Sequence, residues 1–261
     1  MTRVLVTVAH PDDETFGLGS VIALAAAEGA DVTVYCATRG EAGDTARSGA
    51  VDLGAVREAE LHTAATILGV GRVIGPGFVD SGMTAEPPPG SLVATPFDEV
   101  LTVIRSVVDE VGPDLVLTTD VEHGDGHRDH DRIGQATLAA CAERPDLPVY
   151  AWAVERSLLA RWLAELAQQR PDSEHLDLDR ADLGRPVEDI TVRIDVSAVR
   201  EVRERAIAAH ASQQSPYDQM PAELRDEFLM TDRLVRLQPA TGPAGWCSIT
   251  DLAGTPAAIS P

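Results

Sequence analysis

The sequence predicts an α/β fold with a mostly parallel sheet. Two short apolar and β-branched stretches, residues 3–9 and 31–38, have the composition of strands buried on both faces. The Leu- and Ala-rich segment between them, residues 17–28, has the length of a crossover helix and ends before Gly29. Strand, helix and strand in this order form a βαβ unit, the building block of parallel sheets.

The remaining elements follow from hydrophobic periodicity. Apolar positions at helical spacing predict helices over residues 51–68, 97–111, 129–142, 198–211 and 222–229. Short β-branched runs predict strands over residues 72–74, 114–118, 149–154, 190–196 and 233–237. The strict alternation of residues 190–196 is typical of a half-exposed edge strand.

Segments without such periodicity mark the loops and the end of the domain. Residues 75–95 are rich in Pro and Gly and predict a long loop, and the pattern also weakens over residues 170–189. We expect a single domain over residues 1–240, followed by a poorly ordered Gly/Pro/Ala-rich tail over residues 241–261.

Composition and charge exclude several classes of protein. The formal net charge is −21, and nucleic-acid binding depends on clustered Lys and Arg, so we expect no nucleic-acid partner. The apolar stretches are shorter than the roughly 20 residues that span a bilayer, and no signal-peptide pattern precedes the first strand. Cys36, Cys141 and Cys247 show no CxxC spacing, which fits a reducing compartment. We therefore expect a cytoplasmic protein without a membrane span.

Two clusters of acidic and histidine residues follow predicted strands. His10-Pro11-Asp12-Asp13-Glu14 comes directly after the first strand, and residues 122–130, which hold His123, His127 and His130, follow the strand at 114–118. The carboxyl ends of parallel strands share one crevice, where ligands bind. We expect the two clusters to meet there.

Histidines and carboxylates in this arrangement suit a catalytic zinc site, which takes three such ligands and leaves a position for water. Consecutive Asp12 and Asp13 cannot easily point the same way, so one can bind metal while the other acts as a base. Taken alone, the Asp-Asp-Glu run could be a helix N-cap and the second cluster a polar surface loop. Their occurrence at matching strand ends favours a metal site.

These motifs resemble the LmbE-like (PIG-L) N-acetylglucosaminyl deacetylases, which include the deacetylases of mycothiol and bacillithiol synthesis. The resemblance runs from Val4 to about Gln213 and is strongest in Ala9-His10-Pro11-Asp12-Asp13-Glu14 and His127-x-Asp129-His130. Supporting motifs are Thr38-Arg39-Gly40-Glu41-Ala42-Gly43, Arg57-x-x-Glu60, Asp80-Ser81-Gly82 and Ala209-His210-Ala-Ser212-Gln213. The resemblance implies a Rossmann-like, three-layer α/β/α fold.

The resemblance also implies roles for individual residues. The metal ligands would be His10, Asp13 and His130. Asp12 would be the general base for the attacking water, and His127, held by Asp129, would stabilise the oxyanion. Two further residues, Arg57 and Asp80, would contact the sugar. Taken alone, Arg57 could equally be a surface partner of Glu60, and Asp80 a turn residue; His210 could be a supporting or a packed histidine.

Two positions depart from the family pattern. Arg128 stands where many members have proline, and Asp125 stands where the mycothiol-pathway enzymes have a tyrosine. The second change weakens an assignment to mycothiol synthesis and suggests the hypothesis of a substrate with a cationic group.

The sequence therefore predicts zinc-dependent removal of an N-acyl group, most simply acetyl, from a small-molecule amino sugar or N-acetylglucosaminyl conjugate. Fe²⁺ could occupy the same ligands, because geometry and availability decide between such metals. The alternatives are a metal-dependent phosphoesterase, which would use two metals, and an inactive metal-binding module. The sequence also leaves a homo-oligomer open.

Overall fold

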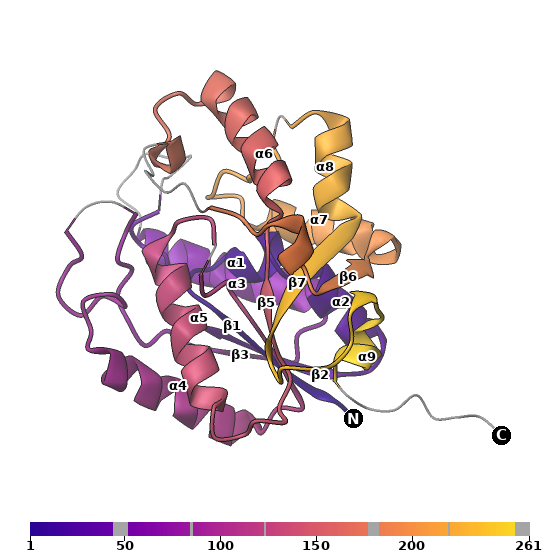
Figure 1. The fold of residues 1–261 in the computed structure, drawn as a ribbon. Helices are drawn as coiled ribbons and strands as arrows, with labels where there is room; N and C mark the ends of the chain where they lie inside the picture. The colour runs from indigo at the N-terminus through magenta and orange to yellow at the C-terminus, as the bar shows by residue number, and fades with distance from the viewer. Residues whose placement is uncertain (44–51, 84–85, 123, 177–182, 219, 254–261) are drawn as a thin grey trace.

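A single sheet runs through the part of the chain that the computed structural model describes, which is residues 1–43, 52–83, 86–122, 124–176, 183–218 and 220–253 (Figure 1). Its strand order is β3-β2-β1-β4-β5-β7-β6-β8. The strands are β1 (Arg3–Val8), β2 (Asp31–Cys36), β3 (Arg72–Ile74), β4 (Leu115–Thr118), β5 (Val149–Trp152), β6 (Val192–Asp195), β7 (Thr231–Gln238) and β8 (Gly245–Trp246).

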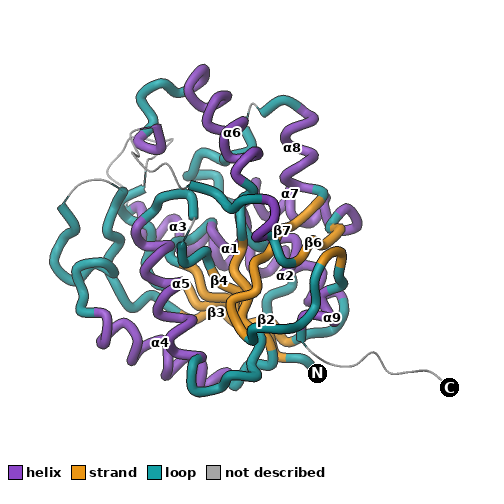
Figure 2. Tube along the Cα trace, in the orientation of Figure 1, coloured by secondary structure: helices purple, strands orange, loops and turns teal. Residues whose placement is uncertain are grey.

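Helices cover both faces of this sheet (Figure 2). They are α1 (Asp13–Phe16), α2 (Gly19–Ala27), α3 (Leu53–Leu68), α4 (Phe97–Val111), α5 (Arg128–Cys141), α6 (Arg156–Gln169), α7 (Arg200–Ala209), α8 (Ala222–Leu229) and α9 (Ile249–Leu252). Short 3₁₀ turns lie at Glu174–Leu176, Val187–Asp189 and Ser197–Val199. The observed fold confirms the predicted α/β architecture.

The central strand β1 places the two acidic clusters side by side. It pairs in parallel with β2 on one side and with β4 on the other, and Thr7 lies opposite Thr118 at the carboxyl end. The chain leaves β1 toward β2 and β3, whereas β4 and β5 extend the sheet in the opposite direction. The carboxyl ends of β1 and β4 thus form a topological switch point, the usual position for a ligand site in such sheets.

Alternate side chains of β1 pack into two different cores. Val4, Val6 and Val8 belong to the core beneath α2, α3 and α7, whereas Leu5 belongs to the core beneath α4 and α5. These residues are essentially inaccessible to solvent. Because successive side chains of a strand point to opposite faces, the buried part of β1 is apolar on both faces, except at Thr7, whose hydroxyl is hydrogen-bonded to Thr118 and Thr137.

Most predicted elements lie within one or two residues of the observed bounds, but one helix was missed and two expectations were wrong. Helix α6 was not predicted, although its buried Leu158, Leu159 and Leu166 recur at helical spacing. Strand β6 is not at the edge, because it lies between β7 and the two-residue β8.

Among the described residues, no helix has both the length and the apolar character needed to cross a bilayer.

The other wrong expectation concerns residues 241–261, which were expected to form a poorly ordered tail. β8 pairs with β6, and Ser248 caps α9 through a reciprocal capping box with Asp251. Ile249 and Leu252 of α9 are buried in the core that contains α2. The packed structure therefore extends past residue 240, at least to the end of α9.

We predict that Leu252→Ala destabilises the protein by about 2–4 kcal/mol, because it removes a fully buried side chain and leaves a cavity. Trp246→Ala is the control, since this large side chain is 67% exposed and its loss should change stability by less than about 0.5 kcal/mol. Urea unfolding followed by circular dichroism measures both. Equal midpoints for Leu252→Ala and the wild type would show that α9 does not stabilise the fold.

Candidate metal centre

The turn after β1 holds its carboxylates through backbone hydrogen bonds. Asp12 has φ 116°, which is unusual for a residue other than Gly, and its N–H donates to Glu14 Oε2 at 2.9 Å. Asp13 Oδ2 accepts the backbone N–H groups of His10 at 2.8 Å and Ala9 at 3.2 Å. The turn therefore directs the neighbouring carboxylates of Asp12 and Asp13 to different positions.

The second loop places two histidines at the start of α5. His127 is the N-cap residue of this helix, and His130 lies in its first turn. Thr119, just after β4, donates its hydroxyl to the carbonyl of His130 at 2.7 Å. His123 lies outside the described residues.

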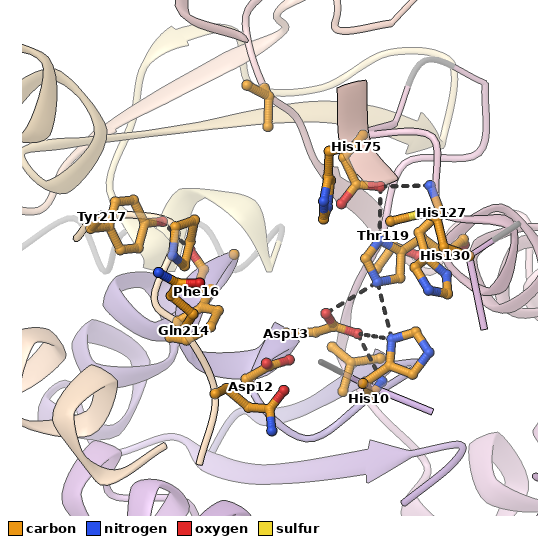
Figure 3. A pocket seen from close by; sticks show the side chains of 18 of the residues that line it. His10, Asp12, Asp13, Phe16, Thr119, His127, His130, His175, Gln214 and Tyr217 are labelled. Atoms are coloured by element: carbon orange, nitrogen blue, oxygen red, sulfur yellow. Dashed lines mark hydrogen bonds and ion pairs between the residues drawn. The ribbon is translucent and has the colours of Figure 1, made fainter. Parts of the chain in front are cut away.

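Three predicted metal ligands converge where the loops meet (Figure 3). His10 Nδ1 and His130 Nε2 are 3.3 Å apart, and the Asp13 carboxylate lies 3.4 Å from the former and 3.1 Å from the latter. Ligand atoms about 2.0–2.2 Å from a tetrahedral zinc are about 3.3–3.6 Å from one another. The spacing of His10, Asp13 and His130 therefore fits a zinc ion.

The tautomers of the two histidines also fit metal binding. His130 Nδ1 lies 3.0 Å from Asp125 Oδ1, and His10 Nε2 lies 3.2 Å from Asp129 Oδ2. Each carboxylate can accept a hydrogen bond from its ring, and in the neutral ring this leaves the lone pair of His130 Nε2 or His10 Nδ1 facing the shared centre. Carboxylate, histidine and metal in this order are the usual arrangement around a bound zinc.

These contacts correct the expectation for Asp129 and show the surroundings of Asp125. The side chain of Asp129 holds His10 and not His127, because His10 lies over the first turn of α5. Asp125 binds His130 and also accepts the backbone N–H of His127 at 3.0 Å, so its carboxylate is engaged within the site. The sequence contained both residues but gave no sign of which ring each would contact.

His127 is arranged as a hydrogen-bond donor. Its Nδ1 accepts the backbone N–H of Asp129 at 3.2 Å, so the proton of the neutral ring is on Nε2. Burial and the neighbouring rings of His10 and His130 lower the pKa of His127 to about 3, which keeps the ring neutral. His127 thus lies beside the candidate ligands with an N–H to donate. Its ring is also close enough to those of His10 and His130 for the three histidines together to hold a metal ion.

Asp12 lies next to the ligands and pairs with Arg57. Asp12 Oδ2 is 3.0 Å from Arg57 Nη2, and burial raises the pKa of Asp12 to about 6 against the attraction of this guanidinium. Arg57 also donates to the carbonyls of Pro11 and Gly40, each at 2.6 Å. Arg57 is therefore a buried support of the Asp12 turn and not a surface partner of Glu60; its expected contact with the sugar stays a prediction.

Asp80 joins the long loop to the site. Its carboxylate accepts N–H groups from Ala42 at 3.1 Å and Gly82 at 2.8 Å, and lies 3.5 Å from His10 Nε2. Arg128 strengthens the junction by donating to the carbonyls of Gly82, at 2.7 Å, and Ser81. Arg128 therefore holds the loop beside α5, and the role of Asp80 toward a sugar stays a prediction.

A buried ion pair beneath Asp12 was not anticipated from the sequence. Glu14 Oε1 lies 2.8 Å from His210 Nε2 and accepts the Thr15 hydroxyl at 2.5 Å. The side chains of Glu14 and His210 are both fully buried. Although burial disfavours the charged ring, the Glu14 carboxylate beside it raises the pKa of His210. The pair connects the Asp12 turn to the end of α7.

Comparison with known proteins identifies the family. The family model PIG-L, described as GlcNAc-PI de-N-acetylase, matches residues 5–141. A 1D-myo-inositol 2-acetamido-2-deoxy-alpha-D-glucopyranoside deacetylase of Geodermatophilus obscurus is 35% identical, over 94% of this chain and 95% of its own length. The chain belongs to the PIG-L family.

Solved structures share the fold at low sequence identity. The A40926 pseudoaglycone deacetylase is similar to this PIG-L chain with a TM-score of 0.63 and 21% identity, covering 92% of this chain and 99% of that one. A 4-carboxy-2-hydroxymuconate hydratase from Pseudomonas putida KT2440 gives 0.58 and 18%, covering 92% and 98%. Since a hydratase also has this fold, the reaction must be inferred from the site.

We predict that Glu14→Ala destabilises the protein by about 3–5 kcal/mol, because it leaves His210 buried without its partner. Glu14→Gln should cost less, since the amide oxygen can still accept one hydrogen bond. Glu223→Ala, an exposed position on α8, is the control and should cost less than about 0.5 kcal/mol. Urea unfolding measures all three, and an unchanged midpoint for Glu14→Ala would contradict the pairing.

Proposed function

We propose that this chain is a zinc-dependent N-deacetylase that removes an N-acyl group, most simply acetyl, from an amino sugar or its conjugate. The observation that carries the proposal is the convergence of His10 Nδ1, the Asp13 carboxylate and His130 Nε2 within 3.4 Å of one another. The named relative from Geodermatophilus removes acetyl from a small glucosamine conjugate, which supports this substrate class. Fe²⁺ fits the same donors.

When bound, the metal polarises the acyl carbonyl and lowers the pKa of the water that attacks it. Asp12 is the base that takes a proton from this water, because its pKa is near neutrality and its carboxylate adjoins the ligands. His127 Nε2 donates to the oxygen of the tetrahedral intermediate. The C–N bond then breaks as the proton on Asp12 passes to the leaving nitrogen, and the products are a carboxylic acid and an amine, which ionise to carboxylate and ammonium.

The described contacts favour one metal per chain. His10 Nε2 also lies near Asp80 and Asp129, which together form a second group of close donors. In this second group His10 Nε2 donates its N–H to Asp129, so it offers no lone pair to a second metal. We therefore expect a zinc content near one per chain by elemental analysis, whereas two would favour a phosphoesterase.

We expect zinc-loaded protein to release free amine from N-acetylglucosaminyl conjugates, and Asp12→Ala to lose this activity while keeping its metal. Asp98→Ala, an exposed carboxylate in the first turn of α4, is the control and should keep full activity. Amine release is measured by a fluorogenic amine assay, with metal-stripped protein alongside. Zinc-loaded protein that is inactive on free and conjugated N-acetylglucosamine would instead support a metal-binding module.

The two histidines of α5 should behave differently when replaced. His127→Ala should lower kcat by about 10²–10³-fold with normal zinc content, because it removes an oxyanion donor. His130→Ala should lose the zinc, because it removes a ligand. Steady-state kinetics and elemental analysis of the same preparations test both roles. Loss of zinc from His127→Ala would make His127 a ligand instead.

A further inference from the structure

The metal centre opens into a cavity of about 290 Å³ that has an apolar far side. Six side chains from three separate segments form this side, and we call them the aromatic wall: Phe16, Trp152, Trp162, Tyr217, Met220 and Phe228. Figure 3 shows Phe16 and Tyr217 across the cavity from His127 and His130. The wall and the metal ligands thus line one continuous space.

Aromatic residues are concentrated in this wall. The whole chain has four Phe, three Trp and three Tyr, which is ten aromatic side chains, and five of the ten belong to the wall. The wall residues other than Tyr217 are half-buried, although such large apolar side chains usually pack fully into a core. Their partly exposed surfaces border the cavity.

The polar atoms of two wall residues, Trp162 and Tyr217, are hydrogen-bonded within the protein. Trp162 Nε1 donates to the carbonyl of Pro216 at 3.0 Å, and the Tyr217 hydroxyl donates to the carbonyl of Phe16. Because these N–H and O–H groups are already used, the two rings offer mainly apolar surface to a ligand. Gln214 also lines this side of the cavity, beside Phe16 (Figure 3), so only the part of a ligand that lies against the rings themselves meets apolar surface.

The wall is also held rigidly. The rings of Phe16 and Tyr217 meet edge to face at 6.2 Å, and Tyr217 packs on Phe228 at 6.0 Å. Arg203, which is fully buried, donates to the Tyr217 hydroxyl at 3.0 Å and forms an ion pair with Asp232 at 2.9 Å. A preformed apolar surface costs little ordering entropy when a ligand binds.

We propose that the aromatic wall binds an apolar substituent of the substrate, an alkyl or aryl group attached to the N-acyl amino sugar. The substrate is then an amphiphilic conjugate whose sugar amide lies at the metal and whose apolar group lies against the wall. This inference rests on the proposed function. The apolar group can be part of the N-acyl chain or of the aglycone, and the chemistry of the wall is the same for both.

Binding measurements separate this inference from the proposed reaction. Zinc-loaded Asp12→Ala protein is titrated calorimetrically with two series of compounds. The first contains methyl, butyl and octyl glycosides of N-acetylglucosamine; the second contains methyl glycosides of glucosamine N-acylated with acetyl, butanoyl and hexanoyl groups. Because burial of one methylene favours binding by about threefold to fourfold, we expect Kd to fall by about that factor per methylene in one series. The series that responds identifies the position of the apolar group.

Two wall variants test where the gain arises. Met220→Gln keeps the side-chain length and adds polarity, and Phe228→Ala removes a ring, so either should reduce the decrease in Kd per methylene by at least half. Binding of the methyl N-acetyl compound should stay within about twofold. Trp246→Ala, an exposed aromatic residue that does not line the cavity, is the control and should keep the full effect.

Flat affinities across both series would overturn the inference, as would a chain-length effect that the wall variants leave unchanged. Either result would leave the proposed deacetylation intact, because amine release by the wild type is measured separately. Conversely, chain-length-dependent binding without amine release would support the wall and contradict the proposed reaction.

Discussion

The parallel pairing of β1 with β4 is the constraint on which the site depends. These strands are more than a hundred residues apart in sequence, yet their register places Thr7 opposite Thr118, so both chains leave the sheet at the same level. The β1 turn brings two ligands and the proposed base, and the β4 loop brings the third ligand and the proposed oxyanion donor. The three side chains that converge at the centre therefore come from both loops.

Once the loops meet, carboxylates determine what each histidine can do. The neutral rings of His10 and His130 each donate a hydrogen bond to an aspartate and keep a lone pair for the centre, whereas His127 Nδ1 accepts a backbone N–H and leaves Nε2–H to donate. Three imidazoles whose ring centroids are 4.5–5.3 Å apart therefore differ in their hydrogen-bonding capacity because their outer partners differ. Two of the chain's many acidic residues, Asp125 and Asp129, orient these rings.

The sequence predicted the sheet from local signals, because apolar runs specify buried strands. The candidate ligands His10, Asp13 and His130 were assigned by resemblance to the family, and the structure brings their side chains together. The partner of Asp129 was beyond such reasoning, since it depends on how α5 lies against the β1 turn. Glu14 and His210 were equally hidden, because their contact joins positions 196 residues apart. Helix α6 was overlooked although its leucines carry the pattern, and the segment after residue 240 was misjudged because composition does not reveal β8 and α9.

Arg203 connects parts of the molecule that would otherwise be independent. Besides Tyr217 and Asp232, it donates to the carbonyls of Thr15 and Phe16, the last two residues of α1. Arg203 therefore contacts both the end of α1 and Tyr217 of the aromatic wall. A mutation of Tyr217, which Arg203 contacts, will therefore also affect the α1 backbone that follows Asp12. Arg203 makes no described hydrogen bond with Met220 or Phe228. The proposed wall can therefore change at these two positions without affecting the hydrogen bonds of Arg203, whereas changes at Phe16 or Tyr217 require compensating changes around Arg203.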